Sequence, residues 1–282
     1  MAIQCNRVAK TIIRRALNED MRKRGDITTR ATVQTNQSGK ARIISRATGV
    51  VSGQAVAAGV FEMLDKSINY ECIVPDGEKV EPNTVVARIK GKMWVILAGE
   101  RTALNIIGRC SGIASLTNEY VSEVIGTLAK ITETRKTAPG LRYLDKAAVV
   151  SGGGVNHRYG LHDAFLIKEN HITAIGGIKE AIEACQAFAE KHGRFRVMVE
   201  AENFDQYQLA LEAKPDRILL DNMSPELIRK CVEARTGDTE LEATGGITLS
   251  NVREYGTAGV DFISIGALTH SVEVLDLSLL VD

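Results

Sequence analysis

The sequence lacks three features that each mark a special class of protein. Its five cysteines are scattered, with no pair at a metal-ligand or redox spacing and no dense disulfide framework. No stretch approaches the roughly 20 apolar residues that span a bilayer, and residues 1–10 lack the apolar core of a targeting segment. These absences predict a cytoplasmic protein with reduced thiols and no membrane-spanning segment.

The chain also lacks an excess of charge of either sign. Its 35 Lys and Arg balance 35 Asp and Glu, which argues against a nucleic-acid or membrane-surface partner. No His and carboxylate set has a helical metal-ligand spacing, and no Gly-x-Ser-x-Gly elbow is present. Zinc chemistry and a serine nucleophile are therefore not expected, and any cationic site must be local.

Helix, strand and turn signals in the first third of the chain favour a small α+β domain. Asn6 can cap a helix whose apolar residues, from Val8 to Leu17, fall on one face at helical spacing. Alternating runs and turn residues predict strands at 41–45 and 84–89, a helix at 54–64 and a turn at 75–78.

The pattern changes after a long helical stretch from Met93 to about Ile125, in which Gly108 and Gly112 predict a break or a bend. Six apolar runs then alternate with helical ones, at 130–134, 163–168, 196–201, 216–220, 240–243 and 261–265. Such alternation predicts parallel βα units that close, or nearly close, into a barrel. We therefore expect an N-terminal α+β domain at 1–112, with the chain's end as a candidate to pack back on it, and an α/β barrel domain at 113–282.

Functional groups of a βα barrel follow the carboxyl ends of its strands, because the βα loops converge there. All six expected strands end in charged residues or glycines. These are Glu133, Thr134, Arg135 and Lys136; Lys168, Glu169, Asn170 and His171; Glu200 and Glu202; Asp221 and Asn222; Thr244, Gly245 and Gly246; and Gly266 and Ala267. A single charged residue after a strand is most often solvated, but the coincidence at six strand ends predicts a site.

The cations and glycines of this set predict anionic ligands. Backbone N–H groups at the last two strands of such barrels commonly bind phosphate, which is one role for Gly245, Gly246 and Gly266. The alternative is that these glycines only form simple turns. A second glycine run, Gly152–Gly154, leads into His157 and Arg158. It is either a flexible loop or a means of bringing two cationic donors to a small anion, for which the planar fork of Arg is suited.

Two acids at the same strand ends modify this interpretation. Glu200 and Asp221 can accept ribose hydroxyls, hold a magnesium ion or stabilise a developing positive sugar. Cations and acids together predict a phosphorylated sugar and a carboxylated partner as ligands.

Several runs of the sequence, in order along nearly the whole chain, resemble the quinolinate phosphoribosyltransferase family. They are Glu-Arg-Thr-Ala-Leu-Asn at 100–105, Thr-Arg-Lys-Thr-Ala-Pro-Gly-Leu-Arg at 134–142, Gly-Gly-Gly-Val-Asn-His-Arg at 152–158, Asp-Ala-Phe-Leu-Ile-Lys-Glu-Asn-His at 163–171, Val-Glu-Ala-Glu-Asn at 199–203, Leu-Leu-Asp-Asn at 219–222, Glu-Ala-Thr-Gly-Gly-Ile at 242–247 and Ser-Ile-Gly-Ala-Leu-Thr at 264–269. The resemblance implies an N-terminal α+β domain and an open α/β barrel. It also implies a homodimer with shared active sites, and leaves a hexamer open.

The resemblance further implies a reaction, in which phosphoribosyl pyrophosphate and quinolinate give nicotinate mononucleotide, pyrophosphate and carbon dioxide in NAD biosynthesis. Mg²⁺ is the implied cofactor. The implied roles are as follows: Arg101 reaches the partner's site; Arg135, His157, Arg158 and Lys168 hold the quinolinate carboxylates; Lys136 binds phosphoribosyl pyrophosphate; Glu200 and Asp221 bind ribose and magnesium; and Thr134, Thr244, Gly245, Gly246, Gly266 and Ala267 complete the substrate site. Lys136, Lys168, Glu200 and Asp221 are the expected catalytic groups.

One departure from the family pattern concerns the acids. Where the family often has three alternating acids before the Asn, this chain has Met198, Glu200 and Glu202. Three alternatives to the main interpretation stay open: a nicotinate phosphoribosyltransferase, a molybdenum-transport accessory protein of the same fold, and a catalytically inactive metabolite-binding barrel. The Lys-Glu-Asn-His run at 168–171 and the Asn-His-Arg run at 156–158 argue against the first two.

Overall fold

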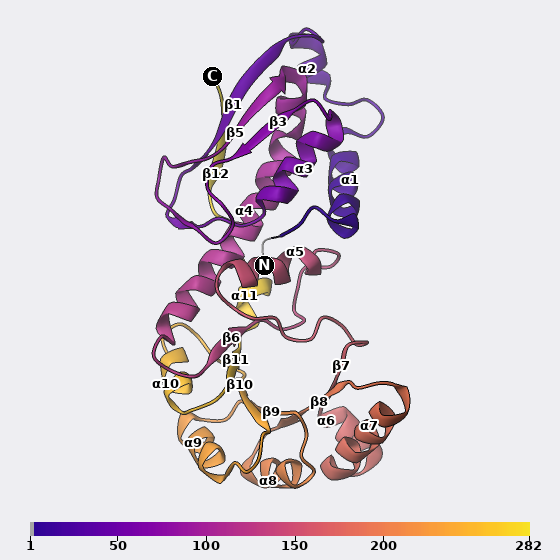
Figure 1. Cartoon of the computed structure of the whole chain (residues 1–282), viewed down its shortest axis with the longest axis vertical. Helices are drawn as coiled ribbons and strands as arrows, with labels where there is room; N and C mark the ends of the chain where they lie inside the picture. Colours follow the sequence, from indigo (N-terminus) through magenta and orange to yellow (C-terminus); the bar gives the residue numbers. More distant parts are fainter. Residues whose placement is uncertain (1–2) are drawn as a thin grey trace. The chain divides into compact units, whose positions relative to one another are not determined.

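The structure is a computed structural model that describes residues 3–282, and the chain forms two compact units (Figure 1). The first unit contains the chain up to Asn118 and two later segments, Thr137–Gly153 and Ala267–Asp282. The second contains Glu119–Lys136 and Gly154–Gly266. Each unit thus combines distant stretches of sequence. Among the described residues, no helix combines the length and apolarity that crossing a bilayer requires.

The first unit is built on a four-stranded antiparallel sheet with the order β12-β1-β5-β3. Its strands are β1 (Ser38–Ser45), β3 (Asn69–Cys72), β5 (Val85–Lys92) and β12 (Leu277–Val281), and β2 (Gly49–Val50) pairs with β4 (Lys79–Val80). Its helices are α1 (Arg7–Met21), α2 (Ile27–Thr32), α3 (Gln54–Leu64), α4 (Met93–Glu123), whose last turn enters the second unit, α5 (Arg142–Ser151) and α11 (Ala267–His270). Strand β12 lies beside β1, so the end of the chain does return to this unit.

Local sequence signals explain most of these elements. The Asn6 side chain caps α1 as predicted, because its oxygen accepts the backbone N–H groups of Val8 and Ala9. Of the break or bend predicted for the long helix, the break is wrong, since α4 runs without interruption through Gly108 and Gly112. The two glycines serve close packing instead: a Cβ at Gly112 would lie 2.0 Å from the carbonyl oxygen of Glu273. The N–H of Leu275 donates to the carbonyl of Gly108, which fixes the segment that leads to β12.

The second unit is an open sheet of six parallel strands with the order β6-β11-β10-β9-β8-β7. The strands are β6 (Lys130–Thr132), β7 (Ala164–Ile167), β8 (Arg196–Ala201), β9 (Arg217–Asp221), β10 (Glu240–Thr244) and β11 (Phe262–Ser264). The helices α6 (Glu169–Ile175), α7 (Ile178–His192), α8 (Phe204–Glu212), α9 (Pro225–Ala234) and α10 (Val252–Thr257) alternate with them. All six predicted strands are present, but β6 and β7 do not pair, so the barrel is incomplete.

The two faces of this sheet differ in chemistry, because side chains alternate along each strand. One face is apolar and buried, as at Val199, Leu220 and Leu241, and Figure 1 shows α7 to α10 on the outer side of the strands. The other face is largely polar, and the strand register arranges it in three rows. From the start to the end of the strands, the rows are Met198, Arg217 and Glu240; then Glu200, Leu219, Glu242 and Phe262; then Asp221, Thr244, Ser264 and Thr132.

Candidate anion-binding site at the strand ends

The carboxyl ends of the six strands form one edge, which we call the rim and define by the predicted residues that follow or end β6 to β11. Thr134, Arg135 and Lys136 follow β6, Lys168 caps α6 after β7, Glu200 lies in β8, Asp221 and Thr244 end β9 and β10, and Gly245, Gly246 and Gly266 follow β10 and β11. Two predicted site residues belong to the first unit: Ala267 begins α11, and Arg101 lies exposed on α4.

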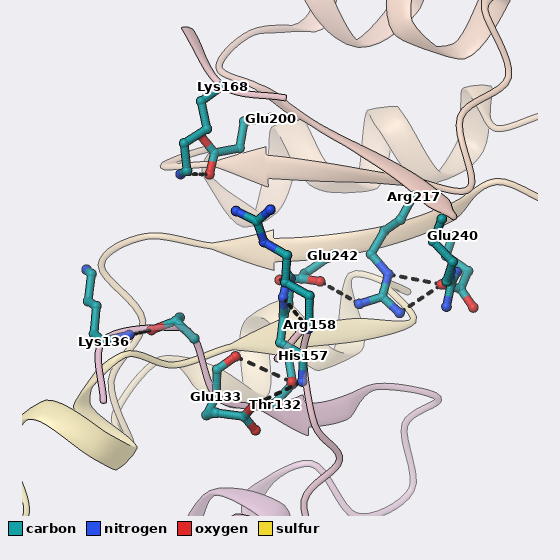
Figure 2. A network of polar contacts seen from close by, with 12 residues as sticks. Thr132, Glu133, Lys136, His157, Arg158, Lys168, Glu200, Arg217, Glu240 and Glu242 are labelled. Carbon is teal, nitrogen blue, oxygen red and sulfur yellow. Dashed lines mark hydrogen bonds and ion pairs between the residues drawn. The ribbon is translucent and has the colours of Figure 1, made fainter. Parts of the chain in front are cut away.

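Lys168 and Glu200 meet at the rim as an ion pair (Figure 2). Lys168 is half exposed, and its backbone N–H donates to Nδ1 of His171, which fixes the start of α6. The carboxylate of Glu200 is 18% exposed. Two groups that the sequence assigned to different ligands are therefore directly paired. Ligand binding must either separate this pair or use its two charges together.

Arg135 and Arg158 are the cations of the rim that lack full pairing. The Nε atoms of both are buried and have no hydrogen-bond partner among the described residues. Arg158 donates from Nη1 to the carbonyl oxygen of Ala164 at 3.1 Å, which holds its side chain in place. Burial, and then the like charge of Arg135, lower the pKa of Arg158. Two neighbouring guanidinium groups with buried unpaired donors favour an anion between or beside them.

The loop after Arg158 is fixed by one carboxylate. Asp163 accepts the backbone N–H groups of Tyr159 at 2.6 Å and of Gly160 at 2.9 Å. Burial opposes the ionisation of Asp163, but these hydrogen bonds outweigh it and lower its pKa. The segment that follows Arg158 is therefore held by its own residues.

His157 lies 9% exposed beneath the rim, and protein atoms surround it. Its backbone N–H donates to Oε1 of Glu133 at 3.1 Å, and its ring Nδ1 accepts the backbone N–H of Arg158 at 2.8 Å. Ring Nε2 lies 3.4 Å from Oε1 of Glu242. Both ring nitrogens thus face protein atoms, and the predicted contact of His157 with a carboxylate of the ligand stays a prediction.

Below His157 lies a group of charges that the sequence did not predict, and two of its members, Arg217 and Glu242, are buried. Arg217 donates from Nη1 to Oε2 of Glu242 at 2.7 Å and from Nε to Oε2 of Glu240 at 2.9 Å. Its guanidinium lies over the Phe262 ring, 3.6 Å from the centroid. Arg196 also pairs with Glu240. Figure 2 shows Arg217 between the two glutamates, and we call Arg217, Glu240, Glu242 and His157 the interior column.

A signal for the column does exist in the sequence. The Glu240-Leu241-Glu242 alternation places two acids on one face of a strand, and Arg217 opens the neighbouring strand. Burial opposes the ionisation of Glu242, which is fully buried, but His157 and Arg217 outweigh it and lower its pKa. Pairing thus keeps a carboxylate charged where water does not reach it.

The glycine end of the rim has the backbone geometry of a tight loop. Gly245 and Gly246 have φ values of 89° and 64°, which favour glycine. A Cβ at Gly245 would lie 2.2 Å from Oδ1 of Asn222. The space beside Gly245 is thus filled by Asn222, whereas a Cβ at Gly246 would meet nothing within 4 Å, so the backbone of Gly246 is open to close approach by a ligand, as phosphate binding through N–H groups requires.

The described residues include no group of three or more His, Cys, Asp or Glu side chains that is arranged to hold a metal ion. Glu200 is paired with Lys168, and Asp221 lies in the next row of the sheet. One or two carboxylates suit a Mg²⁺ ion that keeps its waters and arrives with phosphate groups, since that ion is rarely caged by protein ligands alone. Met198, which stands where the family often has an additional acid, is 3% exposed and lies in the row nearest the start of the strands. That position is in the barrel interior rather than at the rim.

The fold and the rim define a class: an open α/β barrel with an accessory α+β unit and a cationic site at its strand ends. Residues 26–111 match the family model for the quinolinate phosphoribosyl transferase N-terminal domain, and residues 113–280 match the model for the C-terminal domain. The chain therefore belongs to the quinolinate phosphoribosyltransferase family.

Individual relatives agree with this assignment. The chain is 40% identical to a nicotinate-nucleotide pyrophosphorylase [carboxylating] of Mycobacterium leprae over 96% of both proteins. It is 38% identical to a quinolinate phosphoribosyltransferase [decarboxylating] of Nicotiana glauca, over 97% of this chain and 82% of the relative. The solved nicotinate-nucleotide pyrophosphorylase of Francisella tularensis superimposes with a TM-score of 0.92 at 38% identity, covering 99% of both chains.

Proposed function

We propose that the protein transfers the phosphoribosyl group of phosphoribosyl pyrophosphate to quinolinate with decarboxylation. The products are nicotinate mononucleotide, pyrophosphate and carbon dioxide, a step of NAD biosynthesis, and the enzyme is a pentosyltransferase. Family membership supports the reaction. The observation that carries it in the structure is the pair of buried, unpartnered Nε donors on Arg135 and Arg158, because a dicarboxylate supplies the missing acceptors.

Quinolinate binding is assigned to three cations of the rim. Arg135 and Arg158 face its two carboxylates, and Lys168 adds a third positive charge when its ammonium turns from Glu200 to the ligand. Glu200 is then available to a ribose hydroxyl of the second substrate. The ion pair thus keeps both groups ordered and balanced in charge before the substrates bind.

Phosphoribosyl pyrophosphate is assigned to Lys136, Asp221 and the glycine end of the rim. Backbone N–H groups of Gly245, Gly246 and Gly266 suit the 5-phosphate, with Thr134, Thr244 and Ala267 beside the substrate. Asp221 and Glu200 would hold a magnesium ion, which when bound would neutralise charge on the leaving pyrophosphate.

The chemistry needs positioning and electrostatics rather than a covalent nucleophile. The ring nitrogen of quinolinate attacks the anomeric carbon as the bond to pyrophosphate breaks. The carboxylates of Glu200 and Asp221 stabilise the positive charge that develops on the sugar. The pyridinium nitrogen then accepts the electron pair left at the adjacent carbon as carbon dioxide leaves. That carbon finally takes up a proton.

The test of this function is product analysis with quinolinate, phosphoribosyl pyrophosphate and Mg²⁺. We expect nicotinate mononucleotide and carbon dioxide in equal amounts, and little product when nicotinate replaces quinolinate. Nicotinate turned over as well as quinolinate would contradict the assignment and favour the nicotinate enzyme. No turnover of either acid would favour a binding protein.

The cytoplasm is the proposed location, and the five free thiols of Cys5, Cys72, Cys110, Cys185 and Cys231 support it.

A homodimer with shared sites is the proposed assembly, and it rests on Arg101, which lies exposed on α4. If Arg101 completes the neighbour's site, Arg101→Ala and Lys136→Ala proteins are each nearly inactive alone. Mixed and refolded, they recover roughly a quarter of parental activity, because a two-fold heterodimer keeps one intact site. Recovery no greater than the separate controls, with subunit exchange demonstrated, would contradict sharing.

A further inference from the structure

The interior column ends directly beneath a residue assigned to quinolinate. Arg217 contacts Glu242, Glu242 lies 3.4 Å from Nε2 of His157, and Nδ1 of His157 accepts the backbone N–H of Arg158 at 2.8 Å. Every side chain of this series is at most 9% exposed, apart from Arg158. The contacts thus connect a fully buried carboxylate to the backbone from which the Arg158 guanidinium extends (Figure 2).

These contacts fix the protonation of the His157 ring. A nitrogen that accepts an N–H must carry a lone pair, so Nδ1 is unprotonated and the ring proton resides on Nε2. Oε1 of Glu242 has no hydrogen-bond partner among the described residues, but it lies 3.4 Å from Nε2, and its negative charge favours a proton there. Arg217 in turn keeps the carboxylate ionised and directs Oε2 away from the ring.

We propose that Glu242 is a positioning residue for quinolinate: through the Nε2-protonated His157 ring it fixes the backbone N–H of Arg158, and with it the direction of the Arg158 guanidinium. Glu242 contacts neither substrate in this arrangement. The quinolinate part of the inference rests on the proposed function, whereas the state of the ring does not.

Replacement of Glu242 by Gln is the sharpest change, because it alters hydrogen bonding with little change of shape. Arg217 has only donors, so the Gln carbonyl must turn toward it. The Gln amide NH₂ then faces Nε2 of His157, which must accept. The ring proton moves to Nδ1, where it opposes the N–H of Arg158, and the Arg158 backbone loses its acceptor.

The first arm of the experiment is nitrogen NMR of the protein labelled at histidine, with the His157 signals assigned by their loss in His157→Asn. In the parent we expect an unprotonated Nδ1 and a protonated Nε2, and in Glu242→Gln the reverse. A protonated Nδ1 in the parent would overturn the inference. This measurement on the parent decides the point even where the variant does not fold.

The second arm measures KM for each substrate in Glu242→Gln and in the matched control Glu240→Gln. Both glutamates bind Arg217, but only Glu242 lies beside His157. We expect Glu242→Gln to raise KM for quinolinate on the order of tenfold, because a misdirected guanidinium loses its ligand geometry. KM for phosphoribosyl pyrophosphate, and both values in Glu240→Gln, should stay within about twofold of the parent.

Two kinetic results would overturn the positioning role: an unchanged KM for quinolinate in a folded Glu242→Gln, or an equal rise in the Glu240→Gln control. The second result means that any loss of a partner of Arg217 has the same effect. A parent protein that does not turn over quinolinate would instead refute the proposed function. The NMR result would then still decide whether Glu242 sets the His157 ring.

Discussion

The interior column and the rim treat buried cations in opposite ways. In the column, Arg217 is 7% exposed in its side chain and has two carboxylates and an aromatic ring as partners. At the rim, Arg135 and Arg158 keep buried Nε donors without a hydrogen-bond partner among the described residues. The column is formed by His157 and by side chains of β9 and β10, whereas the two rim cations lie in the segments that follow β6 and precede β7.

The difference separates charges that maintain the fold from charges reserved for a ligand. A buried cation that is fully paired holds its neighbours in one arrangement, and removing a partner is costly. A buried cation with unpaired donors costs stability until an anion arrives, and that cost adds to the anion's affinity. Mutations that remove a charge should therefore affect stability most in the column and ligand binding most at the rim.

The largest expected effect is on stability, in Arg217→Met. The change leaves Glu242 buried without its cation, which we expect to lower the free energy of unfolding by about 3–5 kcal/mol. The control is Arg196→Met, because Arg196 pairs with the same Glu240 but is 48% exposed; its loss should cost less than about 1 kcal/mol. Urea unfolding followed by circular dichroism measures both, and equal losses would contradict the comparison.

At the rim, Arg158→Ala should weaken quinolinate binding by about 2–3 kcal/mol, which is roughly 30- to 150-fold, since a charged hydrogen-bonding partner is removed. Its stability should fall by no more than about 1 kcal/mol, because the change removes one hydrogen bond, from Nη1 to the carbonyl oxygen of Ala164. Lys136→Ala is the control: it should impair use of phosphoribosyl pyrophosphate and leave quinolinate binding intact. Isothermal titration distinguishes the two, and parental affinity in Arg158→Ala would remove that residue from the site.

A smaller effect concerns pH. The pKa of Glu242 is lowered in the folded protein, so its stabilising contribution is complete above the unfolded value of about 4.3 and declines as the pH falls further. The difference in melting temperature between the parent and Glu242→Gln should therefore be constant from about pH 7 to about pH 5 and shrink below about pH 4. A difference that grows under acid conditions would mean that the carboxylate is not held ionised.

The sequence predicted the elements whose signals are local. The Asn6 cap, the helix at 54–64 and the six strands follow from capping and periodicity, and all are confirmed. The sequence did not predict that the helix runs intact through Gly112. Glycine is needed there because the backbone of Glu273, more than a hundred residues away, packs against it. A pattern read along one helix carries no information about that contact.

The sequence likewise predicted one part of the candidate site, the rim, and not the interior column. Strand ends placed Lys168, Glu200 and Asp221 at one edge without any long-range information. The interior column depends instead on which face of β10 meets Arg217 and on what lies above it. The sequence shows two acids at Glu240 and Glu242, but not that His157 connects one of them to Arg158.

The central claim is that the rim cations form a site for two adjacent carboxylates. Isothermal titration of the parent with quinolinate, phthalate and nicotinate tests it most directly, since phthalate keeps both carboxylates without the ring nitrogen and nicotinate keeps one carboxylate. We expect quinolinate and phthalate to bind at least roughly tenfold more tightly than nicotinate, because an unpaired buried donor costs about 1–3 kcal/mol. Nicotinate binding as tightly as quinolinate would contradict the account.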